Sequence, residues 1–190
     1  MKQYATKGCP VDVNRTWTLE ELDAAVERGP HASALEPDAI DQIQEEAREK
    51  ESQGFAKVHK WEDLRANLAK HPQLKISPLA MIPHKSRQYR AILDLSFELW
   101  VTGYLLPSVN DTTNKCAPEA AIDQIGTVLP RIIEALALAD PTLGDVVFSK
   151  LDVKAGFWRM VCAKGQEHNF AYVLPNHPGE PVEVVVPSAL

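Results

Sequence analysis

The stretch from Val146 to Val161 constrains the fold most, because it joins a strand-forming run to a tight turn and a pair of aromatic rings. Residues 146–151 are mainly β-branched or apolar, which is typical of a strand. Asp152 follows at once, the chain turns at Ala155-Gly156, and Phe157-Trp158 leads back into an extended pattern. A carboxylate at a strand end beside a turn suits a metal and substrate corner, but it is more commonly part of an ordinary hairpin. The residues alone leave both interpretations open.

The segments on either side predict an α+β layer. Apolar residues fall on one helical face from Pro118 to Leu136, so we expect a long helix whose apolar face packs on the core. Pro130 lies in the middle of it, which predicts a kink or two abutting helices. Residues 169–175 and 182–187 predict two further strands joined by a turn at 176–179. A long helix that feeds three successive strands is typical of the α+β class.

The N-terminal region, residues 1–70, predicts helices and no chemistry. Thr18 and Glu21 form a capping box at the start of a short helix, which ends at Gly29-Pro30. A longer helix begins at Pro37 and ends at Gly54. Apolar residues from Val58 to Leu68 recur at three- and four-residue intervals and predict a third helix. We expect His59 and His71 at the surface, because neither has a second metal ligand at helical spacing.

The pattern changes at Ile76 from helical to extended. Residues 76–83 and 89–95 read as two strands around a polar turn, so this segment predicts a β-hairpin with a basic tip. Pro78 and Pro83 place its first strand at a sheet edge or beside a bulge. Lys85, Arg87 and Arg90 either bind phosphates or simply keep an edge hairpin soluble. From Tyr104 to Cys116 we expect a loop.

Composition excludes some classes of function. The chain has 190 residues, of which 45% are hydrophobic, as in ordinary globular proteins, and a net charge of −6. That charge argues against binding of nucleic acid through the electrostatic field of the whole chain, although residues 71–100 are locally basic. No apolar run approaches the roughly 20 residues of a membrane helix, and no secretory signal opens the chain. The cysteines lie far apart in the sequence, which suits a reducing compartment. We therefore expect an intracellular protein that binds no membrane.

A catalytic site built from these residues alone is incomplete. A two-metal centre needs more than one carboxylate. Asp145 is the nearest acid before Asp152, but along an extended strand it lies roughly 23 Å away and on the opposite face. Asp94 would approach Asp152 only if its hairpin strand lay beside the sheet that contains the Asp152 strand. Nothing around Cys162 resembles a nucleophile turn, and the glycines form no phosphate-binding loop.

Two segments together resemble the reverse transcriptases of retroelements. Residues 82–95 resemble the fingers hairpin, in which a lysine-bearing turn precedes an aromatic-Arg pair and then apolar-apolar-Asp. Residues 148–157 are similar to the first palm motif of the long-terminal-repeat retrotransposon group, Leu-Asp-apolar followed by two variable residues, Gly and an aromatic. Residues 170–175 and 184–190 look like the strands before the next palm motif. The resemblance covers about Ile76 to Leu190.

The resemblance implies a role for particular residues. Asp152 would be the first metal-binding palm aspartate, with the Val153 backbone carbonyl beside it. Backbone amides at Ala155 and Gly156 would face the nucleoside triphosphate, and the Phe157 ring would lie under its sugar and exclude a 2′-hydroxyl. Lys85 and Arg90 would hold the nucleotide phosphates, with Arg87 a weaker candidate at the tip.

The resemblance also implies an architecture and partners. The fold would be the fingers and first half of the palm of a right-hand polymerase: N-terminal helices over residues 1–70, then a basic hairpin, a long helix and an antiparallel palm sheet over residues 71–190. The partners would be an RNA template, a DNA primer and a deoxynucleoside triphosphate, with Mg²⁺ as cofactor. The Tyr-x-Asp-Asp motif that supplies the remaining carboxylates is missing from the sequence. We therefore expect a fragment that is inactive alone.

Two alternatives remain open at this point. In the first, the chain is a non-catalytic module that holds nucleic acid with the basic hairpin. In the second, it is a plain α+β scaffold in which Asp152 only caps a turn.

Overall fold

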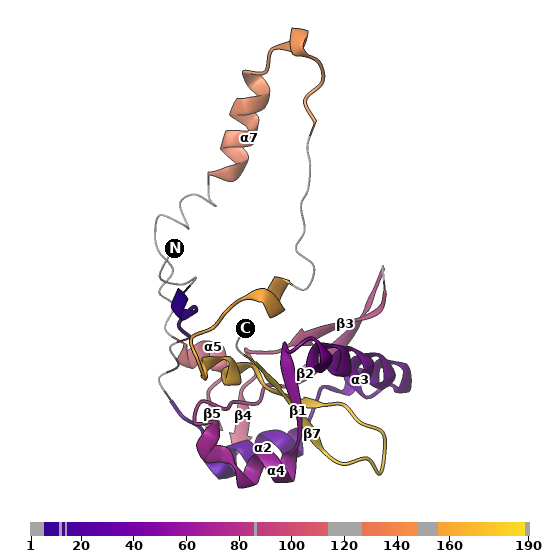
Figure 1. Ribbon diagram of the computed structural model, residues 1–190, viewed down its shortest axis with the longest axis vertical. Helices are drawn as coiled ribbons and strands as arrows, with labels where there is room; N and C mark the ends of the chain where they lie inside the picture. Colours follow the sequence, from indigo (N-terminus) through magenta and orange to yellow (C-terminus); the bar gives the residue numbers. More distant parts are fainter. Residues whose placement is uncertain are drawn as a thin grey trace. The chain divides into compact units, whose positions relative to one another are not determined.

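The computed structural model describes residues 6–11, 13, 15–85, 87–113, 127–147 and 156–188. Contacts divide the chain into two compact units, Met1–Asn114 with Gly156–Leu190, and Lys115–Ala155. The described part holds five α-helices and small antiparallel sheets, so the predicted α+β class is confirmed (Figure 1). None of its helices has both the length and the apolar character needed to cross a membrane.

A three-stranded antiparallel sheet forms the centre of the first unit. Its order is β1 (Ala56–Lys60), β7 (Glu183–Pro187) and β6 (Tyr172–Leu174). Val184 and Val186 enter one core cluster, and Val185 enters the other. Because both faces of the sheet are covered, β7 reads as a continuous apolar run rather than an alternating one. The predicted strand at the C-terminal end of the chain is therefore confirmed.

Helices cover the two faces of this sheet. The first core cluster packs α2 (Leu19–Arg28) and α4 (Trp61–Ala66) on one face, and the second packs α3 (Pro37–Ser52) on the other. The predicted capping box at the start of α2 is present: Thr18 Oγ1 accepts from the Glu21 amide at 3.3 Å, and the Thr18 amide donates to Glu21 Oε2 at 2.7 Å. Gly29 ends the helix at a φ of 68°.

The helix predicted from Val58 to Leu68 is wrong at its start and correct from Trp61 to Ala66. Residues 56–60 form strand β1, and the helix begins only at Trp61. Each residue of β1 pairs with a residue of β7, and the Trp61 amide donates to the Val182 carbonyl at 2.9 Å. Spacing of apolar residues predicts local structure, but pairing with a strand far along the chain decided this segment.

The strand predicted at residues 146–151 is not seen where the structure describes it. Val146 and Val147 belong to no strand and are exposed, and residues 148–151 lie outside the described part. Strand β1, from the N-terminal region, lies next to β7 instead. The strand predicted over residues 169–175 shortens to β6, because residues 166–170 form a 3₁₀ turn.

The predicted hairpin is confirmed as β2 (Leu79–His84) and β3 (Arg87–Leu93). It forms its own two-stranded sheet, with an irregularity at Pro83/His84, as its prolines predicted. The inner face, which includes Leu79 and Met81, packs in the second core cluster. The outer face, which includes Ile82 and Arg90, is exposed.

The loop predicted from Tyr104 onward is wrong for its first part. A small hairpin of β4 (Leu99–Val101) and β5 (Tyr104–Leu106) occupies this region, followed by the one-turn helix α5 (Val109–Thr112). Ser108 and Asp111 make a second capping box there. The remaining helices are single 3₁₀ turns: η1 (Ala32–Ala34), η2 (Leu68–Lys70), η3 (Pro141–Leu143), η4 (Gly156–Arg159) and η5 (Gln166–Phe170).

The second unit contains helix α7 (Val128–Ala137). Pro130 lies in its first turn, where the missing amide removes no intrahelical hydrogen bond, so the described helix needs no kink at this residue. Residues 118–126 of the predicted helix lie outside the described part. The apolar face of α7 was predicted to pack on the core, but none of its residues is buried: Leu129 is 66% exposed and Ile133 is 58% exposed.

Candidate functional site

The predicted palm corner is described only from Gly156 onward. Asp152, Val153 and Ala155 lie outside the described residues, so their predicted roles stay predictions. Gly156 and Phe157 open the 3₁₀ turn η4, in which Gly156 is partly exposed. The extended pattern predicted after the aromatic pair is therefore wrong at its first residue, since the turn continues through Arg159.

The second ring of the aromatic pair has a structural role. Trp158 is half-buried and packs against the second core cluster. Next to it, the Arg159 guanidinium lies 5.8 Å from the centre of the Phe55 ring. These contacts attach η4 to the rest of the first unit.

The hairpin presents Lys85 and Arg90 to solvent. Lys85 lies in the turn, and Arg90 lies on the outer face opposite Ile82. In the described part of the chain, neither side chain has an ion-pair or hydrogen-bond partner. Arg87 begins β3. The structure therefore places two of the predicted phosphate-binding residues at exposed positions of one hairpin.

Helix α3 holds the hairpin by polar contacts as well as by packing. The Gln42 side chain accepts from the Tyr89 amide at 3.0 Å and donates to the Tyr89 carbonyl at 2.9 Å. Gln88 donates to Asp38 at 2.9 Å. An amide side chain that satisfies both polar groups of one strand residue caps an otherwise open edge.

Asp94 does not reach a catalytic site in the described part of the chain. It closes the turn after β3, where Oδ1 accepts from the Ser96 amide at 3.1 Å and the Ser96 hydroxyl at 2.6 Å. His31 Nε2 lies 3.4 Å from Oδ2. Burial acts to raise the pKa of Asp94, but the hydrogen bonds from Ser96 and His31 outweigh it, so the pKa lies below the ordinary value.

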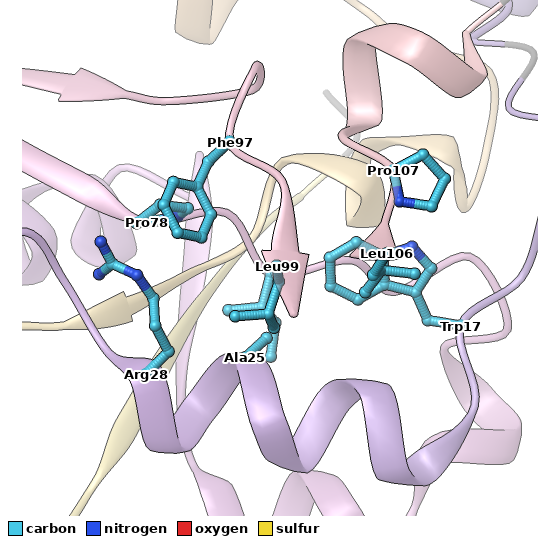
Figure 2. A pocket seen from close by; sticks show the side chains of 9 residues that line it. Trp17, Ala25, Arg28, Pro78, Phe97, Leu99, Leu106 and Pro107 are labelled. Atoms are coloured by element: carbon cyan, nitrogen blue, oxygen red, sulfur yellow. The ribbon is translucent and has the colours of Figure 1, made fainter. Parts of the chain in front are cut away.

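A small apolar pocket lies behind this turn (Figure 2). The Arg28 guanidinium stacks 4.4 Å from the centre of the Phe97 ring and donates to the carbonyls of Gly29 at 2.7 Å and Pro30 at 2.8 Å. Burial lowers the pKa of Arg28, partly offset by Asp94. The pocket volume is about 10 Å³, room for about one water, so this pocket is a packing feature.

A cluster of histidines was missed from the sequence. The rings of His59 and His71 lie 5.8 Å apart, and those of His71 and His168 lie 4.6 Å apart. His59 and His71 were predicted to be isolated surface residues, but tertiary structure brings them together from separate segments. Burial first, and then the neighbouring charged groups, lower the pKa of His71. Burial also lowers the pKa of His168, although Glu167 opposes this.

No protein-family model, no curated protein and no solved structure matches the chain.

The described residues do not fit a two-magnesium centre. As the side chains stand, no three His, Cys, Asp or Glu residues of the described part form a group that could hold a metal ion. Asp94 is bonded to Ser96. Asp140 is bonded to Thr142, with Oδ1 accepting from the amide at 2.8 Å and from the hydroxyl at 2.7 Å. We therefore derive no catalytic step through Mg²⁺.

Proposed function

We propose that this chain contributes the fingers and the first part of the palm of a reverse transcriptase, in which the basic hairpin contacts nucleic-acid or nucleotide phosphates. The observation that carries the proposal is the exposed pair Lys85 and Arg90 on a hairpin whose inner face is held by the core. The order of the two motifs, a basic hairpin followed by the Asp152 segment, supports it.

The structure of the hairpin suits a phosphate-binding element. Its inner face is anchored, so the backbone of β2 and β3 is ordered before a ligand arrives and little conformational entropy remains to be lost. Lys85 and Arg90 are not neutralised by acids of the described part. A cation without an internal partner keeps its full attraction for a phosphate. The net charge of −6 belongs to the whole chain, whereas the hairpin, residues 79–93, contains three basic residues and no acidic one.

Replacing either hairpin cation is expected to weaken binding to an RNA–DNA duplex. Lys85→Ala and Arg90→Ala each remove one phosphate contact, so the salt dependence of the binding constant should fall by about one unit of slope. Fluorescence anisotropy of an end-labelled duplex, titrated at several salt concentrations, measures both affinity and slope. Lys60→Ala is the matched control, because Lys60 is exposed at the end of β1, outside the hairpin. Unchanged binding by both hairpin variants would contradict the proposal.

Primer extension by this 190-residue chain is expected to be undetectable. The resemblance assigns Asp152 as the single palm carboxylate within the sequence, and two Mg²⁺ ions need more than one carboxylate to hold them. The measurement is extension of a labelled DNA primer on an RNA template with Mg²⁺ and all four deoxynucleotides. Nucleotide incorporation that Asp152→Ala abolishes would show that the chain supplies a complete centre, against this expectation.

A further inference from the structure

Three histidines and one glutamate are among the residues that line an open pocket. His59 comes from β1, His71 follows η2, and Glu167 and His168 belong to η5. The pocket has a volume of about 600 Å³ and all of its lining residues belong to the first unit. It is separate from the hairpin and from the pocket behind Asp94, and the proposed polymerase function does not use it.

Each of these four residues has a buried polar atom without a hydrogen-bond partner. The atoms are His59 Nε2, His71 Nδ1, His168 Nδ1 and Glu167 Oε2. A buried polar atom without a partner lowers stability, and native proteins carry few of them. The contact between His168 Nε2 and Glu167 Oε1 is 3.7 Å long and uses neither unpaired atom. Because all four residues line the same pocket, a ligand bound there would supply the missing partners.

The chemistry of these atoms favours a cation over an anion. An unpaired carboxylate oxygen at the Glu167 side chain, which is 10% exposed, would repel a phosphate. Imidazole nitrogens and a carboxylate oxygen are instead the donors that zinc-class ions take. The lysines of the pocket, Lys7, Lys57 and Lys164, are exposed to solvent.

The spacing of two ring pairs, His59–His71 and His71–His168, is compatible with coordination of one ion. Two imidazoles on one tetrahedral zinc ion, with Zn–N bonds of about 2.0–2.1 Å, have ring centres on the order of 5 Å apart. The observed separations of 5.8 Å and 4.6 Å bracket that value. The side chains as they stand do not form a ready metal group, so binding requires the imidazoles to turn about their side-chain bonds. The open pocket gives them room to do so.

We propose that His59, His71, His168 and Glu167 bind one divalent transition-metal ion of the zinc class. With four protein donors the site would be closed, as structural zinc sites are. The ion would join β1, the segment after η2 and η5, which are distant in the sequence. Its binding free energy would therefore stabilise the first unit.

The test is a zinc titration of the purified 190-residue chain, freed of affinity tag and bound metal. Competition with a chromophoric chelator is expected to give one Zn²⁺ per chain. Saturating Zn²⁺ is expected to raise Tm by on the order of 5 °C. Co²⁺ is expected to give the intense visible absorption of a tetrahedral site. No Zn²⁺ binding, or no rise in Tm on binding, would overturn the proposal.

Matched variants locate the ion. His71→Ala and His168→Ala are each expected to weaken Zn²⁺ binding by at least about 100-fold. His177→Ala is the control, because His177 pairs with Asp41 at 2.8 Å on the surface and is expected to leave zinc binding unchanged. Circular dichroism without metal checks that each variant folds. Equal Zn²⁺ affinity in folded His71→Ala and the parent chain would place the ion elsewhere and contradict the assignment.

Discussion

Replacing Glu21 by alanine is expected to lower the free energy of unfolding by about 3 kcal/mol, the low end for breaking a buried ion pair. The Glu21 carboxylate is fully buried, pairs with Arg15, and accepts from the Tyr104 hydroxyl at 2.6 Å and the Thr18 amide at 2.7 Å. The expected loss lies at the low end because the Arg15 side chain is 37% exposed and can be solvated again. Denaturant unfolding measures it.

A control variant and a titration test whether the loss of stability comes from the Glu21 contacts. Glu20→Ala is the matched control, because Glu20 lies in the same first turn of α2 but is exposed, so its change should stay within about 0.5 kcal/mol. The hydrogen bond to Glu21 raises the pKa of Tyr104, so ultraviolet titration of Glu21→Ala should show a lower pKa for Tyr104. Equal stability of the two variants would mean that the Glu21 cluster does not hold α2 to the β4–β5 hairpin.

Raising the pH from 7 to 9.5 is expected to stabilise the fold through Lys75. This side chain is fully buried, and its Nζ donates to Asn169 Oδ1 at 2.7 Å. Burial, and then the charge of Arg15, lower its pKa from 10.5 to about 8. Between these values the unfolded chain binds more protons than the folded chain, so stability rises with pH. The gain attributable to Lys75 over this interval is about 2 kcal/mol.

The contribution of Lys75 is isolated by comparison with Lys75→Met. This variant keeps a side chain of similar length without the ammonium group, so it should be more stable than the parent chain at pH 7. The difference should shrink as the pH rises. Subtracting the two pH profiles removes the titration of Cys162, whose burial raises its pKa and opposes the trend. Lys60→Met, at an exposed lysine, should follow the parent profile. A pH-independent difference between Lys75→Met and the parent chain would contradict the expectation.

Local features were predictable because short-range contacts create them. The capping box of Thr18 and Glu21 needs only a hydroxyl and a carboxylate three residues apart. The hairpin from Leu79 to Leu93 follows from two apolar runs around a polar turn. The exposure of Lys85 and Arg90 follows from the same pattern. These predictions depend on neighbours in the sequence, and the structure confirms each of these features.

Other features depended on residues far apart in the sequence. Val58 has helical spacing with Trp61 and Leu64, but pairing with Val185 makes it part of a strand. His59, His71 and His168 gave no signal, because they come from three segments that meet only in the folded chain. A site whose residues come from separate segments leaves no characteristic spacing in the sequence, so it could not be predicted from the sequence.

The sequence by itself determined the starts of α2 and α3, the basic hairpin and the motif around Asp152, because each depends on side chains within a few residues of one another. Tertiary structure alone decided that β1 from the N-terminal region lies beside β7 near the end of the chain. It also decided that Glu21 and Lys75 are buried, and that three histidines share one pocket. The physical reason is that burial and long-range pairing are properties of the packed core, which no short segment contains.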